Sequence, residues 1–585
     1  MADDADFQAR TFAYAPHADQ RAPAPVRRPV VIVGAGPVGL ALAIDLAQRG
    51  LPVVLLDNDD KLSTGSRAIC FAKRTLEIFD RLGCGDRMVA KGVSWNVGKV
   101  FLRDEMLWRF DLLPDAGHER PAFVNLQQYF VEGYLVERAR QLPLVDLRWR
   151  SEVVATEPRD DHVALTIATP DGEHRLEAEW VVACDGSRSA VRRHLGLESQ
   201  GRTFRDRFLI VDVRLTRDPP AERWFWFDPT FHPDQSVLLH RQPDGVCRID
   251  FQLGWDADPE HEKKPENIIP RVKALLAHSP VLKDAEFTLE WASVYTFSCQ
   301  RMARFRHGRV LFAGDAAHGV SPFGARGANS GVQDVDNLAW KLAAVVRAQA
   351  PGALLDTWAR EREAAADENI RHSTRSTDFI TPKSAVSRLF RDAVLTLART
   401  QPFARTLVNS GRLSTATTLH DSPLNTPDVD AFDGAMCPGA AAADARVTLA
   451  DGHEDWLLRR LGDGFVALVG ADGATELALR DVAVDGFALR VLAIAPAGAL
   501  TSTPPRADAA APAREARARD ACAPEALIDT DGAVTRRYDL RPGGVVLLRP
   551  DAHVCARWRT ATPAHVERAM RRALGLVLEE APPCR

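Results

Sequence analysis

Apolar and polar positions near the N-terminus follow the order strand, helix, strand. The apolar run at 30–33 (Val-Val-Ile-Val) predicts a short buried strand. A helical pattern follows over 38–49, Gly50 occupies the place of a C-terminal cap, and 53–56 predicts a second buried strand. This order predicts a parallel sheet. Residues 1–28 are polar, rich in Ala and Pro and without periodicity, which predicts an extended N-terminal arm.

Turn residues between alternating apolar segments predict antiparallel strands farther along the chain. Pro170-Asp171-Gly172 separates one pair of such segments, and Pro243-Asp244-Gly245 separates another. Residues 200–300 therefore predict an antiparallel sheet layer that covers a ligand pocket.

The second half of the chain predicts helices and then a further domain. Two helical patterns fill 331–370, and a proline-containing linker follows at 421–440. Beyond this linker the composition shifts toward Ala, Arg, Asp and Gly. A strand is predicted at 545–550, and a final helix at 563–574 has Thr562 as its N-cap. These signals predict a separate C-terminal α/β domain.

Composition narrows the class of protein. A chain of 585 residues is too long for one hydrophobic core, so we expect roughly two to four domains. A formal net charge of -5 gives no reason to expect a nucleic acid or an anionic membrane as a partner. The 9 cysteines show no CxxC spacing, so we expect no metal site and reduced thiols in the cytoplasm. Pro37 and Asp45 interrupt the apolar run at 30–46, which argues against a membrane span.

The turn after the first strand carries a dinucleotide fingerprint. Gly34-Ala35-Gly36-Pro37-Val38-Gly39 reads GxGxxG between a strand and a helix. Gly34 suits a tight turn, Gly36 lets the backbone approach a pyrophosphate, and Gly39 allows close packing of helix and strand. Asp57 ends the second strand, where an acid bonds the ribose hydroxyls. The fingerprint predicts a dinucleotide but does not separate FAD from NAD.

Two further motifs carry a family resemblance. The segment 183–192 (ACDGSRSAVR) and the segment that starts Gly314-Asp315-Ala316-Ala317-His318 follow the fingerprint in order across 29–375. Together they resemble the class A flavoprotein aromatic hydroxylases, which are FAD-dependent monooxygenases. Residues 547–551 and 556–558 are similar to the C-terminal extension of the phenol hydroxylase and 3-(3-hydroxyphenyl)propionate hydroxylase branch.

The resemblance implies an α/β architecture. It consists of a Rossmann-like FAD-binding domain of the glutathione-reductase type, an interleaved antiparallel β-sheet substrate domain and a thioredoxin-like α/β domain at the C-terminus. The expected limits are an arm at 1–28, the first part of the FAD-binding domain at 29–199, the substrate domain at 200–300, the second part of the FAD-binding domain with a helical segment at 301–425, and the thioredoxin-like domain at 426–585. A homodimer is also implied.

The resemblance also implies how FAD is held. Asp315 holds a ribityl hydroxyl, and Arg67 and Gln128 contact the cofactor. The backbone N–H groups around Gly327, Ala328 and Asn329 approach the pyrimidine end of the flavin. Asp185 and Gly186 touch both the flavin and the nicotinamide of NADH or NADPH, which binds transiently because no second GxGxxG occurs in a strand–helix setting.

The implied reaction is hydroxylation of a phenolic compound with NAD(P)H and O2. The reduced flavin forms a C4a-hydroperoxide whose terminal oxygen passes to the ring, so the cofactor carries the hard chemistry. One alternative is a flavin-dependent halogenase or a non-aromatic oxygenase on the same fold. Trp224-Phe225-Trp226-Phe227 lacks the Gly-Trp-x-Trp-x-Ile-Pro frame of halogenases. Another alternative is a flavin-binding sensor or interaction protein.

The substrate side is less determined. The resemblance implies Pro322 beside the flavin edge and the substrate hydroxyl. The candidate groups that activate the substrate are Tyr295, which shares a strand face with Ser293, and His240. Arg248 and Asp250 lie two apart on a strand, so they either bind a substrate carboxylate or pair with each other. Further candidates are the alternating aromatic residues at 224–227. Ile69-Cys70 stands in the segment where phenol hydroxylase relatives carry an Asp, so the identity of the base is open.

Overall fold

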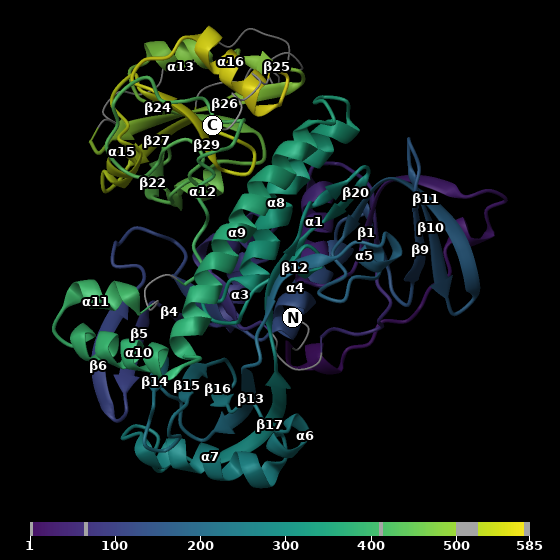
Figure 1. The fold of residues 1–585 in the computed structure, drawn as a ribbon. Coiled ribbons are helices and arrows are strands. Elements are labelled where there is room, and N and C mark those ends of the chain that lie inside the picture. Colours follow the sequence, from purple (N-terminus) through teal and green to yellow (C-terminus); the bar gives the residue numbers. More distant parts are fainter. Residues whose placement is uncertain (1–3, 64–67, 409–412, 499–524, 578–585) are drawn as a thin grey trace. The chain divides into compact units, whose positions relative to one another are not determined.

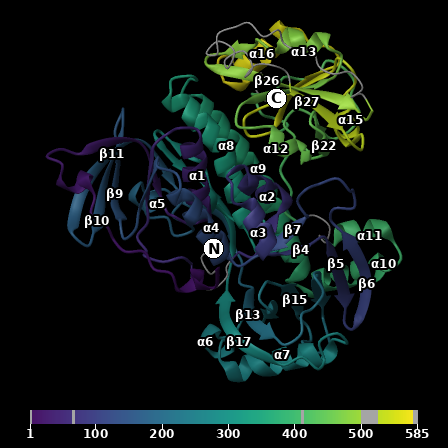
Figure 2. The same ribbon diagram turned by 180° about the vertical axis from the view of Figure 1, so that it is seen from behind.

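The computed structural model describes residues 4–63, 68–408, 413–498 and 525–577. The chain forms two compact units, and Figures 1 and 2 colour it along the sequence. Unit 1 consists of Met1–Pro114, Arg120–Val335 and Ala366–Thr415. Unit 2 consists of Asp115–Glu119, Asp336–Ala365 and Ala416–Arg585. The C-terminal domain that the sequence predicts therefore also includes earlier helical residues.

The first sheet of unit 1 is the predicted parallel sheet. Its order is β19 (Arg306–His307), β20 (Val310–Phe312), β11 (Gly172–Ala183), β1 (Val26–Val33), β2 (Val53–Leu56) and β8 (Val145–Arg148), and β10 (Val163–Thr169) with β9 (Glu152–Pro158) extends it at β11. β1 runs parallel to both β2 and β11. Helix α1 (Pro37–Gln48) connects β1 to β2, as the helical pattern predicts. Val30–Val33 is fully buried because strands covered on both faces form continuous apolar runs.

The second sheet of unit 1 is antiparallel apart from one pair. Its order is β17 (Phe287–Tyr295), β13 (Arg207–Leu215), β16 (Val246–Leu253), β15 (Ser236–Arg241), β14 (Arg223–Phe227), β5 (Val97–Leu102) and β6 (Glu105–Asp111). Five of these strands lie in the predicted range of 200–300. β5 and β6 come from earlier in the chain, and β5 pairs parallel with β14. The sheet therefore exceeds the predicted range at 97–111.

The two faces of this second sheet have different partners. Trp224 and Trp226 of β14 pack in the core that α7 (Pro265–His278) completes on one face. Phe225 and Phe227 belong to a different core cluster on the opposite face. Strand alternation places odd and even positions of β14 on opposite faces, as the sequence predicts.

The remaining elements of unit 1 connect these sheets. One small sheet has the order β12 (Ser199–Thr203), β18 (Ser298–Met302) and β21 (His318–Gly319). A second small sheet has the order β3 (Cys70–Ala72), β7 (Phe123–Asn125) and β4 (Val93–Trp95). The helices are η1 (Asp4–Ala9), η2 (Ala18–Arg21), α2 (Lys73–Arg81), α3 (Gly85–Lys91), α4 (Gln128–Arg140), α5 (Ala190–His194), α6 (Pro259–Glu262), η3 (Gly314–Ala316), α10 (Ala385–Ala398) and α11 (Pro402–Leu407). The predicted helical patterns become α8 (Gly327–Val346) and α9 (Leu354–Ile380), which is longer than predicted.

Unit 2 contains the predicted C-terminal α/β fold. Its sheet has the order β23 (Glu454–Trp456), β22 (Arg446–Leu449), β27 (Glu525–Asp529), β26 (Phe487–Pro496), β24 (Phe465–Gly470), β28 (Val545–Leu548) and β29 (Val554–Trp558), with β25 (Ala483–Val484) beside β26. Its helices are α12 (Leu457–Arg460), α13 (Ala474–Leu479), α15 (Ala533–Tyr538) and α16 (Pro563–Ala573), and it also contains α8 from Asp336 onward and α9 as far as Ala365. The Thr562 side chain caps α16 by accepting from the His565 N–H, which confirms the predicted cap.

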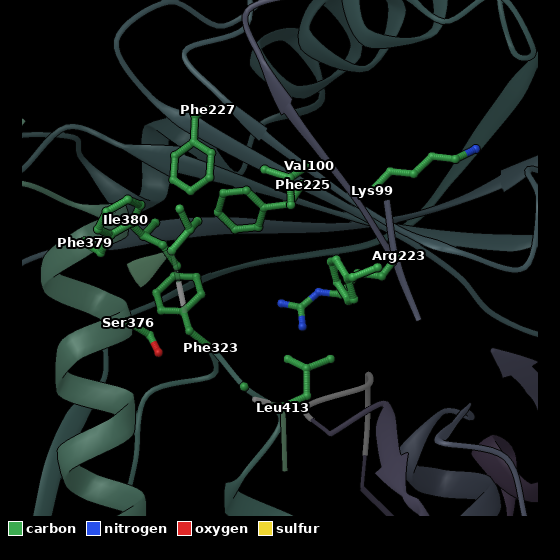
Figure 3. Close-up of a pocket in the computed structure, with 13 residues that line it drawn as sticks. Lys99, Val100, Arg223, Phe225, Phe227, Phe323, Ser376, Phe379, Ile380 and Leu413 are labelled. Carbon is green, nitrogen blue, oxygen red and sulfur yellow. The ribbon is translucent and has the colours of Figure 1, made fainter. Parts of the chain in front are cut away.

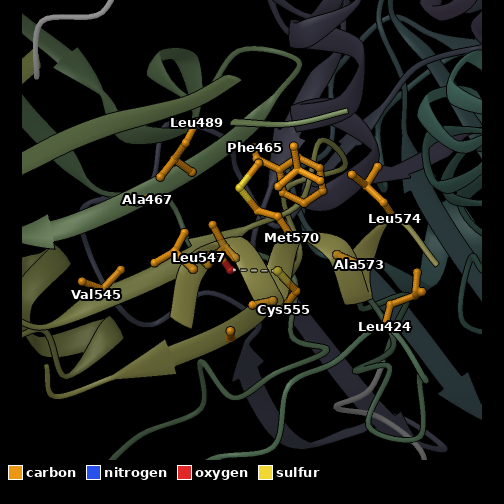
Figure 4. Packing of buried hydrophobic residues seen from close by; sticks show 14 of the residues in the cluster. Leu424, Phe465, Ala467, Leu489, Val545, Leu547, Cys555, Met570, Ala573 and Leu574 are labelled. Carbon is orange, nitrogen blue, oxygen red and sulfur yellow. Dashed lines mark hydrogen bonds between the residues drawn. The ribbon is translucent and has the colours of Figure 1, made fainter. Parts of the chain in front are cut away.

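An apolar core and a buried ionic cluster stabilise unit 2. Figure 4 shows the apolar core, where Phe465, Leu547 and Met570 pack together. The ionic cluster, here called the Glu361 cluster, consists of Asn337, Lys341, Glu361, Ser422, Arg549 and Asp551. The thioredoxin-like character of unit 2 stays a prediction. Among the described residues, no helix is both long enough and apolar enough to cross a membrane.

Candidate active site

The glycine-rich turn has the geometry of a phosphate cradle. Gly34 has a φ of 104°, and a Cβ there would lie 2.5 Å from the Cys184 carbonyl oxygen. A Cβ on Gly39 would lie 2.0 Å from the Gly34 carbonyl oxygen, so only glycine lets α1 pack on this turn. A Cβ on Gly36 would meet no atom within 4 Å. The open space beside Gly36, at the N-terminus of α1, fits a pyrophosphate.

Asp57 follows β2 and is tied to the same turn. Its carboxylate accepts hydrogen bonds from the Ala35 N–H at 2.6 Å and from the Asp59 N–H at 2.8 Å. Burial raises the pKa of Asp57, and these two hydrogen bonds work against the shift. The carboxylate is therefore fixed at the edge of the turn, where the sequence places the ribose contact.

The Asp185-Gly186 pair leaves acceptor capacity unused. Asp185 Oδ2 accepts from the Val191 N–H at 3.1 Å, whereas Oδ1 is buried and has no hydrogen-bond partner. Gly186 has a φ of 75°, and a Cβ there would meet no atom within 4 Å. A buried acceptor without a partner costs free energy, so it points to a ligand that donates to it. The hydroxyls of FAD are such donors, and the residues present therefore fit this cofactor.

The buried carboxylate of Asp334 fixes the second FAD motif in place. Asp334 Oδ2 accepts from the Gly314 N–H at 3.0 Å and contacts His318 Nε2 at 2.7 Å. His318 is buried. Asp315 is exposed between the buried residues Gly314 and Ala316. Its carboxylate therefore faces outward from the motif, as a ribityl contact requires.

The loop that follows has a special backbone conformation. Gly324 has a φ of 103° and Ala325 has a φ of 53°, a region that residues with a side chain seldom occupy. The Asn329 side chain accepts from the Ala72 N–H at 2.8 Å and donates to the Cys70 carbonyl at 2.9 Å. This side chain is occupied in holding β3, so only the backbone of Gly327, Ala328 and Asn329 remains for the flavin. Pro322 is exposed.

Gln128 is the first residue of α4 and ties down the segment after β2. Its side chain accepts from the Ala68 N–H at 3.1 Å and donates to Glu132 at 2.8 Å. The predicted cofactor contact Arg67 lies outside the described residues.

An aromatic cavity lies beside this loop in unit 1. Phe323 and Gly324 of the loop form part of its wall (Figure 3). The other lining residues come from β5, β6, β14 and α9 and from two positions farther along the chain, and are Lys99, Val100, Phe110, Arg223, Phe225, Phe227, Ser376, Phe379, Ile380, Val408 and Leu413. The lining is mostly apolar and aromatic, as expected for the binding site of a small aromatic molecule. Sequence reasoning did not single out Arg223 or Phe379.

The predicted substrate-activating residues divide between two places. His240 is buried on the sheet face that carries Arg223, in register with it, but is not among the residues that line the cavity. Its Nε2 lies 3.9 Å from Asp250 Oδ2, and its Nδ1 lies 3.9 Å from Cys70 Sγ. Tyr295 is 42% exposed on the edge strand β17 and is not among the residues that line the cavity. Its ring stacks on Phe297, at 6.3 Å between centroids.

Burial governs the charges around His240. It lowers the pKa of His240 well below its usual value, with the charges of Arg223 and Arg248 acting in the same direction. The imidazole is therefore neutral at physiological pH. Burial raises the pKa of Asp250 to about 6, and that of the Cys70 thiol to about 11. Arg248 pairs with Asp212 through two hydrogen bonds of 2.8 Å, so it does not pair with Asp250.

Comparisons with known proteins agree with this geometry. The family model described as "FAD binding domain" matches residues 27–373. The chain is 32% identical over 547 residues to 6-methylpretetramide 4-monooxygenase of Streptomyces rimosus, with 90% of each chain covered. It is also 32% identical over 372 residues to 3-(3-hydroxy-phenyl)propionate/3-hydroxycinnamic acid hydroxylase of Escherichia coli (strain K12), covering 62% of this chain and 64% of that one.

Solved structures share the fold. The flavin-dependent monooxygenase PieE, in complex with FAD and substrate, superimposes with a TM-score of 0.74 at 22% identity. The match covers 94% of this chain and 100% of PieE. Because it extends over nearly the whole chain, the similarity includes residues beyond the part that the family model matches.

Proposed function

The chain belongs to the FAD-binding-domain family and is an FAD-dependent monooxygenase, and from this premise we propose that it hydroxylates a phenolic aromatic compound with NADH or NADPH and O2. The observation that carries the substrate class is the aromatic cavity. Phe225 and Phe227 line it from the sheet, and Phe323 and Gly324 line it from the loop of the second FAD motif. A flat aromatic ring is the ligand that such walls hold best.

The glycine-rich turn and the two acidic motifs would hold FAD. The pyrophosphate would lie against Gly36 and the N-terminus of α1, with Asp57 at the ribose. Asp185 Oδ1 and Asp315 would accept from hydroxyls of the cofactor, and Gly186 would leave room for it. The chemistry that bound FAD supplies is acceptance of a hydride and activation of O2.

The residues of the chain orient the substrate and exclude water. The phenylalanine walls exclude bulk water from the reacting ring, which strengthens every polar interaction inside the cavity. His240 is the proposed hydrogen-bond acceptor for the phenol, because burial keeps its imidazole neutral and a neutral imidazole has one ring nitrogen that accepts. Pro322 and Tyr295 stay proposals as further contacts around the reacting centre. A homodimer is likewise proposed, and sedimentation of the purified protein measures it.

Stopped-flow flavin reduction tests this function. The purified protein is mixed anaerobically with NADH or NADPH in the presence of a panel of phenols and hydroxylated aromatic acids. We expect one class of compound to accelerate reduction, and expect O2 then to yield its hydroxylated product. If no aromatic compound changes the rate and O2 yields only hydrogen peroxide, the hydroxylase proposal is wrong, and a non-aromatic acceptor or a sensor role takes its place.

A further inference from the structure

A cation with no bonded partner among the described residues lines the aromatic cavity. Arg223 begins β14, and Figure 3 shows its guanidinium directed into the cavity, between Phe225, Phe323 and Leu413. The guanidinium of Arg223 makes no hydrogen bond or ion pair with any other residue that the structure describes. A guanidinium offers five N–H donors, so this cavity wall contains a large unused capacity to donate hydrogen bonds.

Other cations of the same sheet are paired. Lys99, on the adjacent strand β5, binds Glu222 at 2.7 Å, and Figure 3 shows its amino group pointing away from the cavity. Arg248 holds Asp212 with two hydrogen bonds of 2.8 Å. Arg241 holds Asp218 at 2.5 Å. Carboxylates thus pair with these cations, whereas Arg223 faces the cavity without a bonded carboxylate among the described residues.

The surroundings of Arg223 make this arrangement costly in the absence of a ligand. Burial lowers the pKa of Arg223, and Cys70 and Asp250 only partly oppose it. A guanidinium nevertheless stays protonated in proteins. The nearby groups do not pair with it: burial raises the pKa of the Cys70 thiol to about 11, so the thiol is neutral at physiological pH, and among the described residues Asp250 makes its ion-pair contact with His240, not with Arg223. An anion in the cavity would remove this imbalance.

We propose that Arg223 binds an anionic oxygen of the aromatic substrate, a phenolate or a carboxylate, and so fixes the position of the ring in the phenylalanine-lined cavity. This inference rests on the proposed function, because it names the substrate class of the same site. Charge-assisted hydrogen bonds from a guanidinium to such an oxygen are short and directional. Arg223 is thus a binding residue that selects acidic aromatic compounds over neutral ones.

Ligand binding to the FAD-loaded protein tests the proposal. The probes are two matched pairs that distinguish the sources of the anion. 3-(3-Hydroxyphenyl)propionate against its methyl ester tests a carboxylate, and 4-nitrophenolate against 4-nitroanisole tests a phenolate. Dissociation constants come from the change in flavin absorbance. For at least one pair we expect wild type to prefer the anion by about 10- to 100-fold, and expect Arg223→Gln to abolish this preference. Arg223→Lys keeps the charge but loses the paired donors, so it should retain part of the preference.

Arg109→Gln is the matched control. Arg109 lies on β6, is exposed, and precedes the cavity residue Phe110, so strand alternation directs it away from the cavity. This variant loses the same charge from the same sheet and should keep the full anion preference. Arg223→Gln should unfold at the same temperature as wild type or a higher one, because the lost cation is unpaired. This measurement separates lost binding from lost folding.

Three results would overturn the proposal. One is that wild type binds neither anion more tightly than its neutral analogue. Another is that Arg223→Gln keeps the preference of wild type. The third is that Arg223→Gln purifies without FAD, which would assign the guanidinium to the cofactor. Failure of the proposed function looks different, because the anion preference would then persist while no hydroxylated product forms.

Discussion

Two buried groups of charges, one in each unit, are built on opposite principles. In the Glu361 cluster, Lys341 Nζ and Arg549 Nη1 each contact Glu361 at 2.7 Å, and Arg549 also holds Asp551 at 2.8 Å. Two cations thus face two carboxylates. Burial alone would raise the pKa of Glu361, but the charges of Arg549 and Lys341 hold it well below its usual range.

The cavity face of the second sheet in unit 1 lacks this balance. Arg223 has no bonded partner among the described residues, and one oxygen of Asp250 is buried without a hydrogen bond. Natural proteins satisfy nearly all buried polar groups, so exceptions call for an explanation. The paired cluster therefore contributes to folding, whereas the groups on the cavity face that lack a bonded partner among the described residues are left for a ligand.

The largest predicted effect comes from removing the central carboxylate of the paired cluster. Glu361→Gln leaves Lys341 and Arg549 buried with an uncompensated charge, so we expect unit 2 to lose about 3–5 kcal/mol of stability. Urea unfolding followed by tryptophan fluorescence measures the change. A loss below about 1 kcal/mol would show that the cluster is not structural.

Removing a charge from the cavity face of the second sheet in unit 1 is expected to raise stability instead of lowering it. The folded pKa of Asp250 is raised to about 6 from an ordinary 3.8, so ionisation destabilises the fold, and stability falls as the pH rises from about 4 through 6. Asp250→Asn removes this penalty and should stabilise unit 1 by up to about 3 kcal/mol at pH 8. The same variant should differ little from wild type near pH 3.5. Equal effects at the two pH values would contradict the assignment.

The smallest effect is expected where a pair is exposed. Arg446 and Asp531 lie 2.8 Å apart, with both side chains 41% exposed. Asp531→Asn should change stability by less than about 0.5 kcal/mol, since solvent screens such pairs and either side chain is hydrated alone. If Asp531→Asn and Glu361→Gln lost comparable stability, burial would not explain the difference between the exposed pair and the Glu361 cluster.

The sequence predicts local features well. The turn from Gly34 to Gly39, the acid at Asp57 and the cap at Thr562 are set by contiguous residues whose backbone requirements do not depend on distant parts of the chain. The structure has each of them in the predicted strand, turn or helix. Their contacts with FAD stay predictions.

The cavity could not be predicted in this way, because its walls come from separate segments. β5 pairs with β14, although the two strands are more than a hundred residues apart in the sequence, and no local sequence pattern predicts that pairing. Arg248 and Asp250 illustrate the same limit. They share a face along one strand, yet Asp212 lies opposite Arg248 on the neighbouring strand, and cross-strand neighbours are closer than residues two apart. Arg223 could not be singled out from the sequence, because only the three-dimensional structure shows that its guanidinium has no bonded partner among the described residues.

The alternation along β14 has a consequence for engineering the substrate range. Phe225 and Phe227 can be exchanged to reshape the cavity while Trp224 and Trp226 keep the other side of the strand anchored on α7. Inserting a single residue ahead of this segment would reverse every side chain that follows, placing indoles in the cavity and phenyl rings in the core. Substitution at alternate positions therefore diversifies this site, whereas a change of strand length destroys it.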